Sequence, residues 1–393
     1  MANNNLTKAK QGKKDEFYTQ YPDIQKEIEA YLEYDPDTFK NKVIYSNCDD
    51  PYESNFFRYF VLNFNRLGLK QLITTSYKPS PVANTQVGLF GDDITLEPAK
   101  GRPKITANKF IINEVGDVDG DGQFNLKDVA IQLKANKNNE WKPLLEDGDF
   151  RSAECIELLK QADVVITNPP FSLFREFIKQ ITEHKKQFLI IGNMNAVTYK
   201  ENFSLIKENK MWYGQSISSG DREFQVPDDY PLDAAGSRVE DGKKYIRVKG
   251  VRWFTNLDHG RRHQPLSLMT MKDNLRFNKK LHGKTAYERY ENYDIIEVPF
   301  TNAIPSDYKE IMGVPITFLD KYSPEQFEIV GMCENADLYN LKTRFYTSAE
   351  CKEAYQNKFG KKGTYDLNAS GVLIRNGLQE KVYQRILIKH KKK

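Results

Sequence analysis

The chain has 393 residues, roughly enough for two or three domains, and 39% of them are hydrophobic while 28% are charged. This globular composition supplies a sizeable core, and the 22 Tyr and 23 Phe residues argue against intrinsic disorder. The formal net charge is only +4, so nucleic-acid binding has to be argued from where the charges lie and not from their sum.

Several classes of protein are excluded directly. No apolar run approaches the roughly 20 residues that a membrane helix needs, and the N-terminus lacks the apolar segment of a secretory signal. The 4 cysteines form neither a CxxC pair nor a cluster with histidine, which excludes zinc sites and a disulfide scaffold. We therefore expect a reduced cytoplasmic protein that makes no contact with a membrane.

The hydrophobic patterns of the first half predict alternating helices and strands. Residues 1–16 are polar and basic and are expected to form a mobile arm. The patterns predict helices over 22–33, 52–68, 152–161 and 172–184, and strands over 42–47, 70–77, 109–115, 163–167 and 187–193. A polar loop over 78–106 and an acidic insertion over 116–141 interrupt them. The alternation predicts an α/β fold with a mostly parallel sheet covered on both faces.

One predicted strand runs directly into a rigid loop. Residues 163–167 are followed by Asn168, Pro169, Pro170 and Phe171, and the two prolines fix the backbone and remove two N–H donors. The loop lies at the carboxyl end of a buried strand, where open parallel sheets bind ligands. The Asn168 side-chain oxygen and the Pro169 carbonyl can accept the two hydrogens of an exocyclic NH2 group, which frees its lone pair to attack an electrophilic methyl group. Phe171 would stack on the ring that carries the amine. Taken alone, such a sequence can also be an ordinary loop.

This motif resembles motif IV of the adenine-N6 DNA methyltransferases, which use S-adenosylmethionine. The wider chain is similar to the EcoRI-type family of these enzymes over 16–28, 43–60, 147–150 and 163–177, with a fainter similarity over 251–257. The resemblance implies a Rossmann-like class I methyltransferase domain over 17–210, interrupted by the acidic insertion. A mixed α+β DNA-recognition region over 211–393 would follow it.

The resemblance also implies a function. The enzyme would transfer a methyl group from S-adenosylmethionine to N6 of a flipped adenine at a specific site in duplex DNA. It would belong to a restriction-modification system or an orphan epigenetic system, and a restriction endonuclease acting on the same site would be a candidate partner. The catalytic residues would be Asn168, Pro169, Pro170 and Phe171.

For the cofactor, the resemblance implies contacts from Asn168 and from three pairs of residues: Tyr18 with Thr19, Asp50 with Pro51, and Asp149 with Phe150. The first pair resembles the contact with the methionine end, and the third resembles an acidic-aromatic pair that holds the cofactor's adenine. The second resembles the opening of a cofactor loop, although residues 53–56 lack the glycines that usually follow. Residues 75–77, Thr-Ser-Tyr, stand where an acidic ribose-binding residue is expected.

The second half of the chain is turn-rich, and its positive charge is concentrated in one segment. Residues 243–289 contain 13 Lys and Arg against 3 Asp and Glu, which is a net charge of +10. Lysine and arginine supply phosphate contacts, so beside the methyltransferase motif we predict DNA binding here, although a charged run is often only a solvated surface. The predicted contacts are Arg252, Arg261, Arg262, Lys279 and Lys280.

A second motif lies in the acidic insertion. Residues 117–128 have the spacing of an EF-hand calcium loop, with Gly122 at the sixth position. The predicted ligands are Asp117, Asp119, Asp121, Gln123 through its carbonyl, Asn125 and Asp128. We predict a structural Ca²⁺ site of dockerin-like type, and the alternative is an acidic surface turn that binds no metal.

Two other functions fit parts of the sequence. Loops of the Asn-Pro-Pro type also serve methyl transfer to other planar amines and amides, such as RNA adenine or a protein glutamine. A calcium-dependent binding module of dockerin type would normally carry two such loops and be exported, whereas this chain has one loop and no export signal. The basic segment and the length of 393 residues favour DNA over RNA or protein as the substrate.

Overall fold

The computed structural model describes residues 17–48, 54–77, 107–135, 138–218, 220–226, 230, 232, 236–281 and 283–392. The predicted arm over 1–16, the predicted loop over 78–106 and the predicted cofactor residues Asp50 and Pro51 lie outside these ranges. The chain forms two compact units. Met1–Asn202 and Met211–His259 belong to the first, and Phe203–Lys210 and Gly260–Lys393 belong to the second.

The helices and strands of the first unit follow the predicted order closely. They are β1 (Tyr18–Thr19), α2 (Tyr21–Tyr34), β2 (Val43–Ser46), α3 (Asn55–Leu62), α4 (Phe64–Leu67), β3 (Gln71–Thr75), β4 (Asn108–Ile112), α5 (Leu126–Ala135), β5 (Glu140–Pro143), α6 (Ala153–Gln161), β6 (Val164–Thr167), η2 (Phe171–Leu173), α7 (Phe174–Glu183), β7 (Gln187–Asn193), η3 (Met194–Thr198), β8 (Trp212–Tyr213), β9 (Asp221–Val226), β10 (Arg238–Glu240), β11 (Lys243–Lys249) and β12 (Val251–Thr255). Helix α8 (Lys200–Lys207) begins in the first unit and ends in the second.

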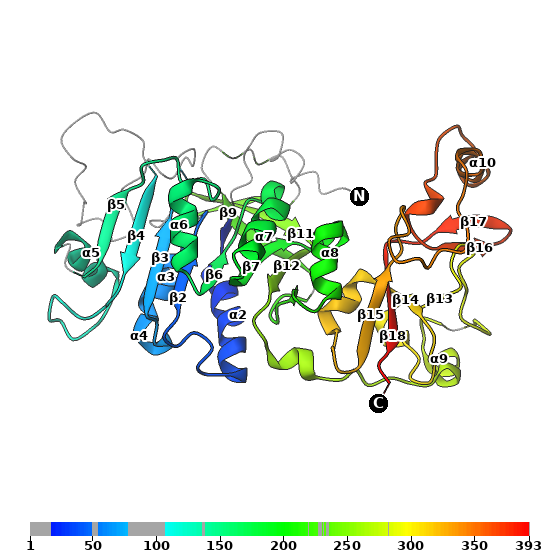
Figure 1. The fold of residues 1–393 in the computed structure, drawn as a ribbon, viewed down its shortest axis with the longest axis horizontal. Helices are drawn as coiled ribbons and strands as arrows, with labels where there is room; N and C mark the ends of the chain where they lie inside the picture. The colour runs from blue at the N-terminus through cyan, green and yellow to red at the C-terminus, as the bar shows by residue number, and fades with distance from the viewer. Residues whose placement is uncertain are drawn as a thin grey trace. The chain divides into compact units, whose positions relative to one another are not determined.

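The large sheet of the first unit has the strand order β5-β4-β3-β2-β6-β7-β12-β8. Its central strands β3, β2, β6 and β7 are parallel and lie side by side (Figure 1). The other four pairings, on the two flanks, are antiparallel. The fold is therefore α/β with a large mixed sheet, and the prediction of a mostly parallel sheet is wrong. Apolar content reveals that a strand is buried but not the direction in which it runs.

Helices pack against both faces of this sheet. Buried residues of α2, α3 and α5 form one hydrophobic cluster with alternate residues of the strands, such as Ile44 and Leu189. Helix α7 packs on the opposite face, where the Phe174 ring lies 5.0 Å from the Phe254 ring of β12. The predicted covering of both faces is therefore confirmed. Residues 211–259 belong to this unit because β12 pairs with β7, so the division between the units differs from the predicted boundary after residue 210.

Local signals in the sequence set the ends of several helices. The Ser54 hydroxyl accepts from the backbone N–H groups of Phe56 and Phe57 and caps α3, and the Ser152 hydroxyl accepts from Cys155 N–H and caps α6. Gly68 ends α4 in the left-handed conformation, with φ +61°. These caps fix where α3 and α6 begin relative to β2 and β6.

A smaller antiparallel sheet in the first unit has the order β1-β9-β11-β10. Strand β1 has only two residues, and its register pairs Tyr18 with Gln225 and Thr19 with Phe224 of β9. The short strand joins the beginning of the described chain to a segment more than two hundred residues later.

The second unit is built around a sheet with the order β13-β14-β18-β15. Its elements are η4 (Gly260–His263), α9 (Met271–Phe277), β13 (Ile296–Glu297), η5 (Thr301–Ala303), β14 (Met312–Pro315), η6 (Ile316–Lys321), β15 (Phe327–Met332), α10 (Ser348–Phe359), η7 (Leu367–Ala369), β16 (Val372–Arg375), β17 (Leu378–Lys381) and β18 (Arg385–His390). Asn376 and Gly377, both at positive φ, turn β16 into β17. No helix in the described part of the chain combines the length and the apolar content needed to cross a membrane.

Glu288 links separate segments of the second unit by ion pairs. Its carboxylate accepts from Arg375 Nε at 2.7 Å and from Arg375 Nη2 at 2.8 Å, and it also pairs with Lys284. The hydrogen bonds from Arg375 outweigh the effect of burial and lower the pKa of Glu288 to about 2. The charged carboxylate therefore stabilises the folded unit.

We expect Glu288→Gln to lower the free energy of unfolding by about 1–2 kcal/mol at pH 7, because the pair is partly exposed. Since the folded-state pKa lies below the ordinary value of 4.5, the stabilisation is present above pH 4.5 and is lost as the pH falls toward 2. Urea denaturation at pH 7 and pH 3 measures this, with Glu328→Gln of the exposed Lys389 pair as the control. An equal deficit at both pH values would contradict the assignment.

Candidate active site

The Asn-Pro-Pro-Phe segment lies at the carboxyl end of the central strand β6. Strand β6 pairs in parallel with β2 and β7, and Asn168 and Pro169 follow its last residue directly. Pro170 precedes the short helix η2, which leads into α7. The Thr167 hydroxyl donates to the Asn47 carbonyl beyond β2, and so ties the two strand ends together. The predicted position of the loop is confirmed.

The carboxamide of Asn168 is held on one side only. The residue is 7% exposed, and its Nδ2 donates to the backbone carbonyl of Phe17. Its Oδ1 is buried and has no hydrogen-bond partner within the described chain. A buried acceptor without a partner costs about 1–3 kcal/mol, so this oxygen is suited to receive a donor from a ligand.

Aromatic rings surround the loop. The Phe171 ring lies 5.5 Å from the Phe17 ring and 6.5 Å from the Phe224 ring, and both contacts are edge-to-face. Phe17 and Phe224 are buried, whereas Phe171 is half-buried. The sequence did not single out Phe224 of β9 as part of this cluster.

The ends of the neighbouring strands also carry buried polar atoms. Thr19 Oγ1, Asn47 Oδ1 and Thr74 Oγ1 are buried and lack a partner among the described residues. Thr19 is the last residue of β1, Asn47 directly follows β2, and Thr74 lies near the end of β3. Three such oxygens at or near the ends of β1, β2 and β3 indicate a region suited to a polar ligand.

The predicted pair Asp149 and Phe150 also lies near the end of β3. A Cβ added to Gly148 would come within 2.0 Å of the Ser76 carbonyl oxygen, so this close approach requires glycine. Phe150 is buried with its ring 5.1 Å from that of Phe177. Burial raises the pKa of the Asp149 carboxyl, but the bonds that it accepts from the Arg151 side chain at 2.6 and 2.9 Å, together with the Arg151 backbone N–H and positive charge, hold the pKa below the usual value.

At the position where an acidic ribose-binding residue is expected, Thr75 and Ser76 make hydrogen bonds within the protein. The Thr75 and Tyr45 hydroxyls lie 3.3 Å apart, and the Ser76 hydroxyl accepts from Asn108 N–H at 2.8 Å. No acidic side chain occupies positions 75–77, and the structure reveals no replacement among the described residues nearby.

The acidic insertion folds into a tight loop before α5. Carboxylate oxygens of Asp117, Asp119 and Asp128 lie within 4.8 Å of one another. Backbone N–H groups of the loop already donate to Asp117 and Asp128, and Lys127 pairs with Asp119 at 3.0 Å. The other predicted ligands, Asp121, Gln123 and Asn125, lie in the same loop, where Asp121 accepts from Gln123 N–H and Asn125 from Lys127 N–H. The calcium site stays a prediction.

The five predicted DNA contacts fall into two groups. Arg252 and Arg262 are buried at 4% and 6% exposure, and they donate to the Ser218 carbonyl and to Asn209 Oδ1 respectively. Arg261 is half-buried, whereas Lys279 and Lys280 are exposed. Only these last two residues present their charge on the surface of the second unit.

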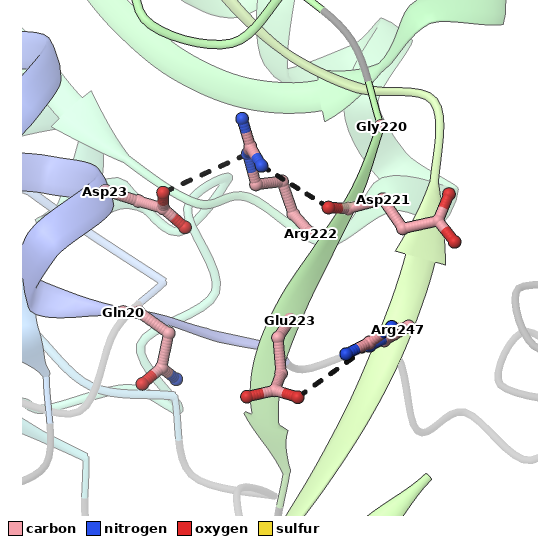
Figure 2. A pocket seen from close by; sticks show the side chains of 7 residues that line it. All are labelled: Gln20, Asp23, Gly220, Asp221, Arg222, Glu223 and Arg247. Atoms are coloured by element: carbon pink, nitrogen blue, oxygen red, sulfur yellow. Dashed lines mark hydrogen bonds and ion pairs between the residues drawn. The ribbon is translucent and has the colours of Figure 1, made fainter. Parts of the chain in front are cut away.

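A pocket of about 570 Å³ lies elsewhere, beside the small sheet. Figure 2 shows Gln20 and Asp23 facing Arg222, Glu223 and Arg247 across it. The ion pairs are loose, at 3.9 Å for Arg222–Asp23 and 4.0 Å for Arg247–Glu223. The residues of the Asn168 loop do not line this pocket.

An α/β unit in which a buried central strand is followed by Asn-Pro-Pro-Phe fits a methyltransferase-type fold. The chain matches the family described as adenine-specific methyltransferase EcoRI over residues 5–391. It belongs to this family.

Similar relatives agree with this assignment. The chain is 41% identical over 337 residues to the Type II methyltransferase M.EcoRI of Escherichia coli, which covers 86% of this chain and 91% of that protein. It is 36% identical over 346 residues to M.MpnI of Mycoplasma pneumoniae and 35% identical over 346 residues to M.MgeORF184P of Mycoplasma genitalium, both Type II methyltransferases, with 87% of this chain and 90% of each relative covered. No solved structure gives a significant match.

The chain is thus an adenine-specific DNA methyltransferase, and S-adenosylmethionine is the methyl donor of this class. The described residues fit such a ligand, because the unpartnered oxygens of Thr19, Asn47 and Thr74 are able to accept hydrogen bonds from amino and hydroxyl groups. Tyr18 and Thr19, which the resemblance assigned to the cofactor, are buried in β1.

Proposed function

We propose that this enzyme methylates N6 of an adenine that it extrudes from duplex DNA at a specific sequence. The observation that carries the proposal is the Asn168 carboxamide, whose Nδ2 is bonded within the protein while its buried Oδ1 is left without a partner. Because the loop follows a central parallel strand, the unpartnered oxygen belongs to a site at the carboxyl edge of the sheet.

In this proposal Asn168 Oδ1 accepts one hydrogen of the adenine amine, and the Pro169 carbonyl accepts the other. Both bonds draw the nitrogen toward tetrahedral geometry and direct its lone pair outward, while Phe171 stacks on the base. S-adenosylmethionine supplies an electrophilic methyl group. The protein itself contributes orientation and hydrogen bonding rather than a nucleophile.

The cofactor is proposed to lie across the ends of β1, β2 and β3, in a Rossmann-like class I arrangement. Thr19, Asn47 and Thr74 supply acceptors, and Phe150 with Asp149 borders the adenine end. Asp50 and Pro51 keep their proposed role in the cofactor loop. The Asp149 carboxylate already accepts from Arg151, and its two oxygens retain acceptor capacity for a further donor from the cofactor.

DNA is proposed to contact the second unit around α9. Within residues 272–280, four exposed cations have no ion pair in the described structure: Lys272, Arg276, Lys279 and Lys280. The exposed ring of Phe277 lies among them, and Lys280 Nζ lies 4.2 Å from the centre of the Phe300 ring. Exposed cations with aromatic rings favour a nucleic-acid surface.

The basic region 211–393 is proposed to recognise the target sequence, but Arg252 and Arg262 are left out of the interface because both are buried. A restriction endonuclease that cuts the same sequence, in the cytoplasm of the same cell, is the proposed partner of the modification activity.

Asn168→Ala is expected to lower kcat for methyl transfer to duplex DNA by at least about 100-fold, because the amine loses its orienting acceptor. Affinity for S-adenosylmethionine, measured by calorimetry, should change much less. Asn202→Ala is the matched control, because Asn202 is also buried, donates from Nδ2 to a backbone carbonyl and has an unpartnered Oδ1, but lies in α8. Retained activity in Asn168→Ala would reject the proposed function, and labelled-methyl transfer to RNA or protein instead of DNA would reject the substrate.

The paired substitution Lys279→Gln with Lys280→Gln should weaken binding to duplex DNA of any sequence. Removing two phosphate contacts should reduce the slope of log K against log salt concentration by about 1.8. Lys358→Gln with Lys389→Gln, which removes cations already paired with Glu380 and Glu328, is the control. Fluorescence anisotropy at several salt concentrations measures the slope, and an unchanged slope would exclude these lysines from the interface.

The acidic loop is proposed to bind Ca²⁺ in a structural role outside catalysis. Calorimetry with Ca²⁺ should give a binding heat for the wild type that Asp121→Ala abolishes, because Asp121 supplies a ligand position in the predicted spacing. Methylation activity should be the same in both proteins. Absence of a binding heat in the wild type would show that the loop is an acidic turn.

A further inference from the structure

We propose that the backbone carbonyl of Phe17 selects the orientation of the Asn168 carboxamide, so that strand β1 is a positioning element of the catalytic centre. The proposal rests on the proposed function of Asn168. It adds a backbone group from the beginning of the fold, 151 residues before Asn168, that acts through the Asn168 side chain.

The chemistry of the two groups makes the contact directional. A carboxamide has one end that only donates and one that only accepts, and the two ends have nearly the same shape. A backbone carbonyl oxygen only accepts. With Phe17 C=O on one side, the NH2 end of Asn168 must face it, and Oδ1 must face the opposite way. The reversed orientation would set two acceptors against each other in a buried site and would present a donor to the amine.

The carbonyl can act in this way because β1 is held from several directions. Its two residues pair with Gln225 and Phe224 of β9, and Asn55 Nδ2 donates to the Thr19 carbonyl at 2.7 Å. The Phe17 ring packs against the rings of Phe171 and Phe224, at 5.5 and 5.8 Å. Phe171 of the motif therefore shares its support with the carbonyl that orients Asn168.

The pairing of this segment with β9 extends only as far as Thr19. Beyond Thr19 the chain leaves β9 for α2, and the pocket in Figure 2 opens between Gln20 and residues 220–223. The Arg222–Asp23 pair across that space is loose, at 3.9 Å. The placement of the Phe17 carbonyl thus depends on the two register pairs, the aromatic contacts and the bond from Asn55, rather than on a long strand.

The decisive variant is Asn168→Asp. The introduced carboxylate has acceptors at both ends, so it can still accept from the amine but is repelled by the Phe17 carbonyl. When the carboxyl is protonated, its O–H can donate to Phe17 C=O and its other oxygen can accept from the amine, which restores the wild-type pattern. Residues 17–19, 43–48 and 164–173 contain Tyr18, Tyr45 and Cys48 as ionisable groups and no charged side chain. Strand β9, which packs against Phe17 through Phe224, carries Asp221, Arg222 and Glu223, and of these Arg222 pairs with Asp23 and Glu223 with Arg238.

We therefore expect Asn168→Asp to be at least about 100-fold slower than the wild type near pH 8. The ratio of variant to wild-type kcat should then rise about tenfold for each unit by which the pH falls, because only the protonated fraction is active. Single-turnover methylation of duplex DNA between pH 5.5 and 8 measures this ratio. Calorimetric binding of S-adenosylmethionine and circular dichroism confirm that the variant is folded.

A ratio that does not change with pH would overturn the proposal, whether the variant is active or inactive throughout. Activity at every pH would mean that any acceptor suffices, and inactivity at every pH would mean that restoring the donor does not help. Both outcomes leave the proposed function standing if Asn168→Ala is inactive. A fully active Asn168→Ala would instead reject the function itself.

A second variant tests the strand without touching the motif, and it decides the matter if Asn168→Asp does not fold. Asn55→Asp keeps the shape of the side chain but removes the donor to the Thr19 carbonyl. We expect kcat to fall about 5- to 10-fold, while KM for DNA and for S-adenosylmethionine stays within about twofold. Asn63→Asp is the control, because Asn63 flanks the same helix and donates to the Tyr59 carbonyl. A rise in KM with unchanged kcat would show that β1 serves binding alone.

Discussion

The structure around the active site depends on one hydrogen bond, from the Asn168 carboxamide to the carbonyl of Phe17. It connects β6, at the centre of the large sheet, with β1, at the edge of the small one. Each partner is fixed by its own surroundings, Asn168 by the prolines that follow it and Phe17 by the pairing of β1 with β9. The bond is directional because the carbonyl only accepts, so the NH2 end of the Asn168 carboxamide must face it.

This connection also explains why residues 211–259 belong with the catalytic unit. Strand β12 extends the large sheet next to β7, and β9 holds β1 in register. Phe224 of β9 and Phe171 of the motif pack on the same ring of Phe17. A segment that follows the catalytic motif in sequence is therefore part of the support on which the motif rests. The positive charge of residues 211–259 does not by itself make them a DNA-binding region, because the Arg252 guanidinium donates to the backbone carbonyls of Val251 and Ser218.

The distribution of charge gives the small net value a structural meaning. Residues 17–19, 43–48 and 164–173, which lie around Asn168, contain no charged side chain, and this suits a reaction that depends on hydrogen bonds and orientation. The acidic loop satisfies its carboxylates with its own backbone N–H groups and Lys127. Unpaired cations, in contrast, gather at residues 272–280 of the second unit. The net charge of +4 is therefore a whole-chain total that hides three environments of different electrostatic character.

Much of the fold could be predicted because its signals are local. Ser152 caps α6, Gly68 ends α4, and the apolar runs at 163–167 and 187–193 form buried strands. The directions of the flanking strands could not be predicted. Strand β4 runs antiparallel to β3, although its residues differ from those of the parallel strands only in alternating between buried and half-buried positions. Direction is decided by how the connecting segments cross the sheet, and hydrophobic patterns do not record that path.

The sequence predicts those parts of the candidate site that are formed by side chains, but not those formed by backbone groups. Asn168, Pro169 and Phe171 can be recognised because their residue types determine their chemistry. The buried strand before them indicates where in the sheet they lie. The Phe17 carbonyl has no such signature, since every residue has a carbonyl and only the register of β1 brings this one to Asn168. Asn202 shows that the bonding pattern of the side chain alone does not identify a catalytic residue. It has the same pattern of one bonded NH2 group and one unpartnered oxygen, yet it lies in helix α8 and does not directly follow a parallel strand. An unpartnered acceptor becomes a candidate for catalysis only where the topology of the sheet brings a ligand to it, and that information is spread over pairings between distant parts of the chain.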